Sequence, residues 1–126
     1  MPRRVLVVDD HPVVALALKL FFKRDGRFVV SATAPTAAAG LALLPGGHDV
    51  VVLDLHLPDL AGPELVRAFR EAAPDTPIIL YSASDDTAEA EAVRPLVDAV
   101  ARKADIPGLV AALERLTAPG TPSPQA

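Results

Sequence analysis

The sequence predicts a doubly wound α/β fold, in which helices cover both faces of one parallel sheet of five strands. Short runs rich in Val, Leu and Ile, typical of strands buried on both faces, alternate along the chain with helical patterns. Two of these runs end in aspartates. Ligands of such folds bind beyond the carboxyl ends of the strands, so these acids stand where function is expected.

The first half of the chain predicts three strands, at residues 4–10, 27–32 and 49–53, because each is β-branched or almost continuously apolar. A helix is expected over residues 12–24, where Pro12 suits a first turn and Lys19 and Lys23 mark the solvent side. An alanine-rich helix is expected over residues 35–44. Glycine and proline then stop the chain before the third strand.

The second half repeats the pattern. Helices are expected from Gly62 to the break at Pro74, from a cap at Asp85 or Asp86 to about Arg94, and from a cap at Asp105 to residue 117. Strands are expected at residues 78–81 and 97–102. Residues 118–126 are rich in proline and glycine without periodicity, which indicates a loose tail or the start of a linker.

Composition narrows the possible functions. A length of 126 residues, with 51% hydrophobic and 22% charged residues, suits one globular domain. The absence of cysteine excludes disulfides and thiol chemistry. The apolar runs are too short to cross a bilayer or form a signal-peptide core, so a cytoplasmic protein without a membrane partner is expected. A net charge of −4 gives no general attraction to DNA.

Polar residues at the predicted strand ends form the candidate site. Asp9 and Asp10 follow the first strand, Asp54 the third, Ser82 the fourth and Lys103 the fifth, so all five are expected at one edge of the sheet. Clustered carboxylates repel one another unless a cation compensates. Magnesium takes carboxylate and phosphate oxygens together, and a lysine and a hydroxyl can neutralise a phosphoryl group. The residues therefore favour phosphoryl chemistry with a divalent metal.

Four motifs resemble the receiver domains of two-component response regulators, over residues 3–117. They are Val-Leu-Val-Val-Asp-Asp-His-Pro up to Pro12, Val-Val-Leu-Asp-Leu-His-Leu-Pro around Asp54 with Gly62 after it, Leu-Tyr-Ser-Ala around Ser82, and Lys103. The resemblance implies a flavodoxin-like sheet of strand order 2-1-3-4-5. It also implies a signalling domain whose only reactions are self-phosphotransfer and autodephosphorylation.

The resemblance also implies roles for single residues. Asp54 would accept the phosphoryl group from a sensor histidine kinase or a phosphotransfer protein that docks on the first helix. Mg²⁺ or Mn²⁺ would be held by Asp10, Asp54 and the backbone carbonyl of His56, with Asp9 acting through water. Ser82 and Lys103 would contact the phosphoryl oxygens, Lys103 acting with Asp54 as a catalytic residue. Movement of Ser82 would reshape the surface of the fourth helix, fifth strand and fifth helix, through which such domains often form homodimers.

Asp-Asp-His-Pro at residues 9–12 and Lys-Ala-Asp at residues 103–105 are most similar to the NarL/LuxR-type branch, whose members commonly carry a DNA-binding helix-turn-helix domain. DNA would be contacted only through such an output domain. We expect a receiver domain at residues 1–118 and a tail or linker at residues 119–126. These limits are compatible both with a single-domain regulator and with a fragment that ends within its linker.

Several alternatives stay open. Val100 stands where the family usually has an aromatic residue, which favours an interaction module that acts without phosphorylation. An aspartate-nucleophile phosphatase would need an acid two residues after Asp54, where His56 stands. We interpret His11 and His56 as loop residues and not as metal ligands, His48 as plain surface, and Tyr81 as a packing residue.

Overall fold

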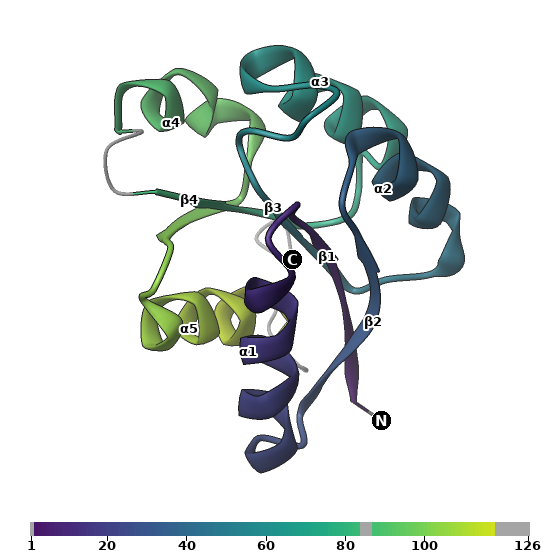
Figure 1. Cartoon of the computed structure of the whole chain (residues 1–126), viewed down its shortest axis with the longest axis vertical. Helices are drawn as coiled ribbons and strands as arrows, with labels where there is room; N and C mark the ends of the chain where they lie inside the picture. The colour runs from purple at the N-terminus through teal and green to yellow at the C-terminus, as the bar shows by residue number, and fades with distance from the viewer. Residues whose placement is uncertain (1, 84–86, 118–126) are drawn as a thin grey trace, which may run out of the picture.

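The computed structural model describes residues 2–83 and 87–117. Within them, five parallel strands form one sheet in the order β2-β1-β3-β4-β5, and helices alternate with the strands along the chain (Figure 1). The predicted fold class and strand order are therefore confirmed. The strands are β1 (Arg3–Val8), β2 (Phe28–Ala34), β3 (Val50–Leu53), β4 (Ile78–Ser82) and β5 (Ala99–Arg102). The helices are α1 (Pro12–Arg24), α2 (Ala37–Leu43), α3 (Gly62–Ala72), α4 (Thr87–Val93) and α5 (Ile106–Thr117).

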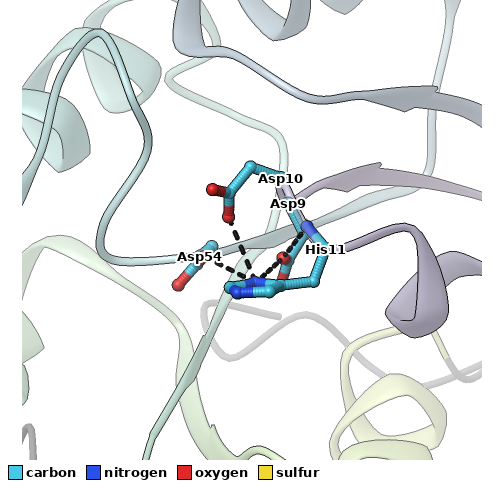
Figure 2. Close-up of side chains that lie close together, drawn as sticks. All are labelled: Asp9, Asp10, His11 and Asp54. Atoms are coloured by element: carbon cyan, nitrogen blue, oxygen red, sulfur yellow. Dashed lines mark hydrogen bonds and ion pairs between the residues drawn. The ribbon is translucent and has the colours of Figure 1, made fainter.

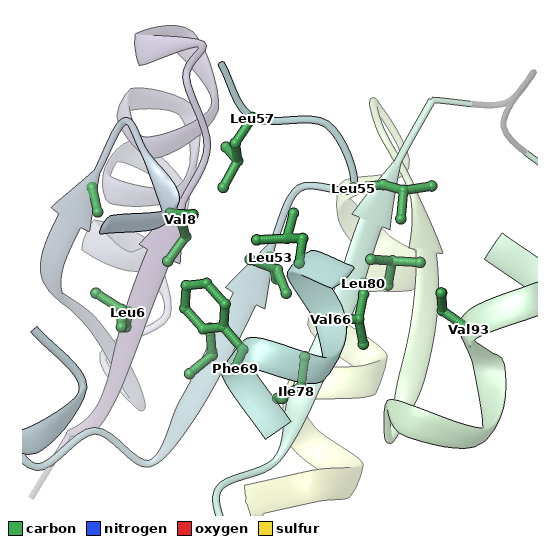
Figure 3. Close-up of a cluster of buried hydrophobic side chains, with 14 of the residues drawn as sticks. Leu6, Val8, Leu53, Leu55, Leu57, Val66, Phe69, Ile78, Leu80 and Val93 are labelled. Atoms are coloured by element: carbon green, nitrogen blue, oxygen red, sulfur yellow. The ribbon is translucent and has the colours of Figure 1, made fainter. Parts of the chain in front are cut away.

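Each face of the sheet has its own hydrophobic core, since successive side chains of a strand point to opposite faces. One core joins α2, α3 and α4 to Leu6, Val8, Leu53 and Leu80 of the strands (Figure 3). The other joins α1 and α5 to alternate strand residues such as Val7, Val52 and Ile79. Figure 1 shows α1 and α5 on one side of the sheet and the other three helices opposite. All four residues of β3 are buried, which explains its unbroken apolar sequence.

Some element boundaries differ from the sequence prediction. The strand β2 continues to Ala34, because its last residues still pair with β1. The helix α4 ends at Val93, and Pro95 lies in a separate 3-10 turn (Arg94–Leu96), which delays the start of β5 to Ala99. The expected caps Asp85 and Asp86 and the expected tail at residues 119–126 lie outside the described residues. No helix in the described ranges is long and apolar enough to span a membrane.

The interpretation of His48 as plain surface is wrong. Its Nδ1 lies 2.6 Å from the Ser31 hydroxyl, and its Nε2 lies 2.8 Å from the carbonyl oxygen of Leu43. The half-buried ring thus joins β2 to the end of α2, a contact between loop and strand that sequence periodicity does not reveal.

Candidate functional site

The ends of three strands bring four predicted site residues together. Asp9 and Asp10 follow β1, Asp54 follows the central strand β3, and Lys103 follows the edge strand β5. Backbone hydrogen bonds hold the ends in register: the amide of Asp54 donates to the carbonyl of Val8 at 2.9 Å, and the amide of Lys103 to that of Ser82 at 2.8 Å. The site is therefore positioned by the sheet itself.

Three carboxylates share a small space at this edge (Figure 2). One ligand atom from each of Asp9, Asp10 and Asp54, together with a ring nitrogen of His11, forms a group whose members all lie within 4.8 Å of one another. Asp9 and Asp54 are buried, whereas Asp10 faces solvent. Burial raises the pKa of Asp54, and the charge of Asp9 raises it further; Lys103 and the amide of His56 oppose this only in part.

Lys103 supplies a countercharge to the two buried acids. Its Nζ lies 3.0 Å from Asp9 Oδ2 and 3.2 Å from Asp54 Oδ2. Burial lowers the pKa of Lys103, but its close contacts with Asp9 and Asp54 and the charges of both acids outweigh this, so that its pKa is raised overall. Lys103 is therefore charged at neutral pH and bridges the ends of β1, β3 and β5.

The turn after β5 fixes the position of Lys103. Ala104 has a positive φ of 72°, a left-handed conformation that is uncommon for residues other than glycine. Its amide donates to the hydroxyl of Tyr81 at 3.1 Å, and Tyr81 is buried. Tyr81 thus packs as expected and also anchors the turn, a second role that its strand position alone does not indicate.

Ser82 is buried at the end of β4. It lines a hollow of about 200 Å³ with Val100 of β5 and Ala90 and Glu91 of α4. Among the described residues, no hydrogen bond joins its hydroxyl to Asp54 or Lys103. The residue predicted to act with Asp54 therefore lines the region between β4, β5 and α4.

The segment after Asp54 forms a tight loop before α3. Buried Leu55 and Leu57 hold it to the core, and the amide of Gly62, whose φ is 66°, donates to the carbonyl of Leu55 at 2.9 Å. The amide of His56 points to Asp54 Oδ1 at 3.4 Å. Its ring Nε2 lies 3.0 Å from Glu89 Oε2 on α4. His56 thus connects the loop with α4 at the mouth of the site, a contact that the sequence analysis missed.

His11 is a loop residue, as predicted, but it lies within the cluster of site residues. Its Nδ1 lies 2.9 Å from Asp9 Oδ1 and 3.1 Å from Asp10 Oδ1 (Figure 2). The signal in the sequence was its place between the acid pair and Pro12, which begins α1. Because α1 begins at the next residue, His11 lies beside the two acids that precede it.

The donor set fits a hard divalent cation such as Mg²⁺. Asp9 Oδ2 is buried and, within the described chain, receives no hydrogen bond. Lys103 Nζ lies 3.0 Å from that oxygen and forms an ion pair with it, although the direction of the contact does not suit a hydrogen bond. Buried carboxylates with unused acceptor capacity, next to the exposed Asp10, are suitable ligands for a metal that keeps several of its waters.

Comparison with known proteins points to one family. Residues 5–114 match the family model described as the response regulator receiver domain. Over 123 residues the chain is 35% identical to a protein-glutamate methylesterase/protein-glutamine glutaminase of Nitrosospira multiformis, covering 97% of this chain and 32% of that protein. It is 34% identical to the TorCAD operon transcriptional regulatory protein TorR of Escherichia coli, covering 68% and 36%. The chain therefore spans about a third of the length of these curated relatives.

Solved structures share the fold. The non-phosphorylated HemR receiver domain from Leptospira biflexa has a TM-score of 0.77 and 27% identity, over 96% of this chain and 98% of that one. A structure of RcsB dimers bound to DNA has a TM-score of 0.82 over 92% of this chain and 60% of that one. At 24% identity, the second similarity concerns the fold alone.

Proposed function

The chain belongs to the response regulator receiver domain family, and on this premise we propose that it is a phosphorylation switch with Asp54 as the acceptor. One observation carries the proposal: the buried carboxylate of Asp54 lies at the end of the central strand, 3.2 Å from Lys103 Nζ. The donor would be a phosphohistidine on a sensor histidine kinase or a phosphotransfer protein. The same proposal places the chain in the cytoplasm.

In the proposed reaction, an oxygen of Asp54 attacks the phosphorus and the bond from phosphorus to the donor imidazole breaks, leaving the electron pair on the ring nitrogen. Asp10, Asp54 and the backbone carbonyl of His56 would hold Mg²⁺ or Mn²⁺, with Asp9 acting through water. The metal would neutralise charge on the transferring group. Lys103 already lies beside the acceptor and would contact a phosphoryl oxygen, since fixed positive charge favours this transfer.

Ser82 would report the phosphorylation. Ser82 lines a hollow between α4 and β5, so a move of its hydroxyl toward the new phosphoryl oxygens would change the packing of Ala90 and Val100. The surface of α4, β5 and α5 would respond, and a homodimer could form there. Val100 is smaller than the aromatic residue usual in the family, which would leave Ser82 room to move without the turning of a large ring.

The face of α1 is suited to docking the phosphodonor. Val13, Leu16 and Leu20 are 65%, 56% and 55% exposed, and their spacing places them on one side of the helix. Beside them, a largely apolar groove of about 400 Å³ extends from Val14 to Lys103. A partner bound along α1 would therefore reach the edge of the sheet where Asp54 lies.

The proposed function also includes domain limits and a branch of the family. We propose residues 1–118 as the receiver domain and residues 119–126 as a tail or linker, and we retain the NarL/LuxR-type branch on the motifs at residues 9–12 and 103–105. A nitrate/nitrite response regulator homologue of Haemophilus influenzae, 30% identical over 83 residues, is compatible with that branch. DNA would be bound only through a separate output domain.

The test is labelling of the purified chain with acetyl phosphate and Mg²⁺, followed by intact mass. We expect wild type to be labelled and Asp54→Asn not, because the amide is no nucleophile for phosphorus. Asp75→Asn is the matched control, since this exposed acid lies in the turn before β4. Persistent labelling of Asp54→Asn would overturn the assignment of the acceptor. We expect no appreciable turnover of small phosphate esters by any of these proteins.

A further inference from the structure

The ring of His11 lies inside the acid cluster and does not serve the helix it precedes. His11 is the N-cap residue of α1, yet its side chain makes no capping hydrogen bond. Its backbone amide donates to Asp9 Oδ1 at 2.9 Å, and its ring Nδ1 lies 2.9 Å from the same oxygen. The two contacts hold the ring over the carboxylates, as Figure 2 shows, although 61% of the side chain remains exposed.

The position of Nδ1 matches that of a metal ligand. It lies 3.1 Å from Asp10 Oδ1 and 4.0 Å from Asp54 Oδ2, and the four groups can each bring one ligand atom within 4.8 Å of all the others. Two ligands on opposite sides of one metal ion are about 4 to 4.6 Å apart, because each bond is about 2.0–2.3 Å long. The separations of the four ligand atoms are therefore close to those around a single ion, for which Lys103 Nζ, 3.4 Å from Nδ1, would have to make room.

A second observation indicates that these carboxylates have bonding capacity left for a cation. The side chain of Asp9 is 2% exposed, and its Oδ2 receives no hydrogen bond from the described residues, with Lys103 opposite it as a charge. The bond from the His56 amide to Asp54 Oδ1 is long, at 3.4 Å. Buried carboxylate oxygens ordinarily have well-formed partners, so this deficit points to a ligand that completes the site.

We propose that His11 Nδ1 is a nitrogen ligand of the metal site, which adapts the site to borderline divalent ions such as Co²⁺, Ni²⁺ and Zn²⁺ besides Mg²⁺. The inference rests on the metal site of the proposed function. Imidazole favours these later metals, whereas Mg²⁺ prefers an all-oxygen shell. His11 therefore contributes much to the affinity for Co²⁺ and little to that for Mg²⁺. It determines which metal the switch accepts.

The experiment compares the binding of Co²⁺ and Mg²⁺ to tag-free chain by isothermal titration calorimetry. His11→Ala is expected to weaken Co²⁺ binding about tenfold or more, the lower end of what changing a group beside a metal costs. Mg²⁺ binding should change by less than about twofold. The visible absorption of bound Co²⁺ should also change with the loss of the nitrogen ligand. His11→Gln, which offers an amide oxygen at a similar reach, should bind Co²⁺ as weakly as His11→Ala.

The matched control is His48→Gln, which removes an imidazole whose partners are Ser31 and the carbonyl of Leu43 and which should leave Co²⁺ binding unchanged. Equal Co²⁺ affinity in wild type and His11→Ala, with Mg²⁺ bound by both, would overturn the role of His11 and leave the phosphorylation site standing. If neither metal bound to wild type, the metal site of the proposed function would fall as well.

Discussion

The carboxylate of Asp54 lies in a buried environment that disfavours its charged form. It is 4% exposed, and the neighbouring charge of Asp9 adds to the effect of burial, so its pKa lies above the ordinary value despite the contact with Lys103. The raised pKa means that the folded chain binds the proton of Asp54 more tightly than the unfolded chain does. The contribution of this group to stability is therefore present at low pH and is lost as pH rises through the folded pKa.

The substitution Asp54→Asn should consequently stabilise the fold at pH 8 without metal, on the order of 1 kcal/mol, because the raised pKa means that the folded chain disfavours the charged carboxylate, and one pKa unit corresponds to about 1.4 kcal/mol. The gain should shrink as pH falls through the raised folded pKa, because the wild-type carboxyl then binds a proton in the folded chain, and it should vanish below the ordinary pKa of an aspartate, where the group is protonated in both states. Urea unfolding at pH 8 and pH 4.5, in the presence of a chelator, measures both values. Asp75→Asn should show no such pH-dependent difference. A gain that grew as pH fell would contradict the burial argument.

At the residue scale, the sequence predicts which side chains follow the strands but not how they turn. Asp54 and Lys103 stand where the order of strands and helices alone places them, beyond β3 and β5. The contact of His56 with Glu89 and that of His11 with the acids depend on loop conformations and side-chain rotamers. Neither follows a periodic pattern, so both were missed.

At the scale of elements, α2 approaches the sheet unusually closely through Gly40. A Cβ added there would lie 2.8 Å from Phe69 Cζ and 3.0 Å from both γ-carbons of Val8. Phe69 belongs to α3 and Val8 to the strand that leads into Asp9, and Figure 3 shows both side chains in the same core. Three elements therefore meet at Gly40. This packing supports the end of β1, which leads directly into Asp9 of the site.

We expect Gly40→Ala to destabilise the chain by roughly 1–3 kcal/mol, the usual cost of overpacking, although alanine is the better helix former. Gly26→Ala is the control, because a Cβ at Gly26 meets nothing within 4 Å. That control should stay within about 0.5 kcal/mol of wild type. Thermal unfolding of wild type, Gly40→Ala and Gly26→Ala measures these differences in stability. Equal stability of both variants would show that α2 can shift away from Phe69.

The sequence predicts the existence of every strand and α-helix in the described part of the chain, but not the two 3-10 turns, and the ends of several elements depend on tertiary contacts. Pairing with β1 extends β2 to Ala34, and the 3-10 turn at Arg94–Leu96 takes residues from both neighbouring elements. Arg70 of α3 stabilises this turn by donating to the carbonyl of Leu96 at 3.0 Å. A contact between residues 26 positions apart is not visible in a local pattern.

At the scale of the whole molecule, the two faces of the sheet have different tasks in the proposed switch. The helices α2, α3 and α4 lie on one face, where the hollow beside Ser82 opens toward α4. On the other face, α1 and α5 cover the second core, and α1 still exposes apolar side chains. Entry of the phosphoryl group and response to it would then occur on opposite sides, with Asp54 between them at the end of the central strand.

This arrangement predicts that docking and chemistry can be separated. Leu16→Gln should slow phosphotransfer from a histidine kinase by about tenfold, since losing an anchor residue of an interface commonly costs more than 1 kcal/mol. Labelling by acetyl phosphate should remain as in wild type, because the small donor needs no docking face. The measurement uses whichever kinase of a purified panel labels the wild-type chain fastest. Val29→Gln, on β2, is the control, as its side chain is also exposed and apolar, at 40%. If both variants slowed transfer equally, the docking surface would extend beyond α1; if neither did, the kinase would approach Asp54 from another side.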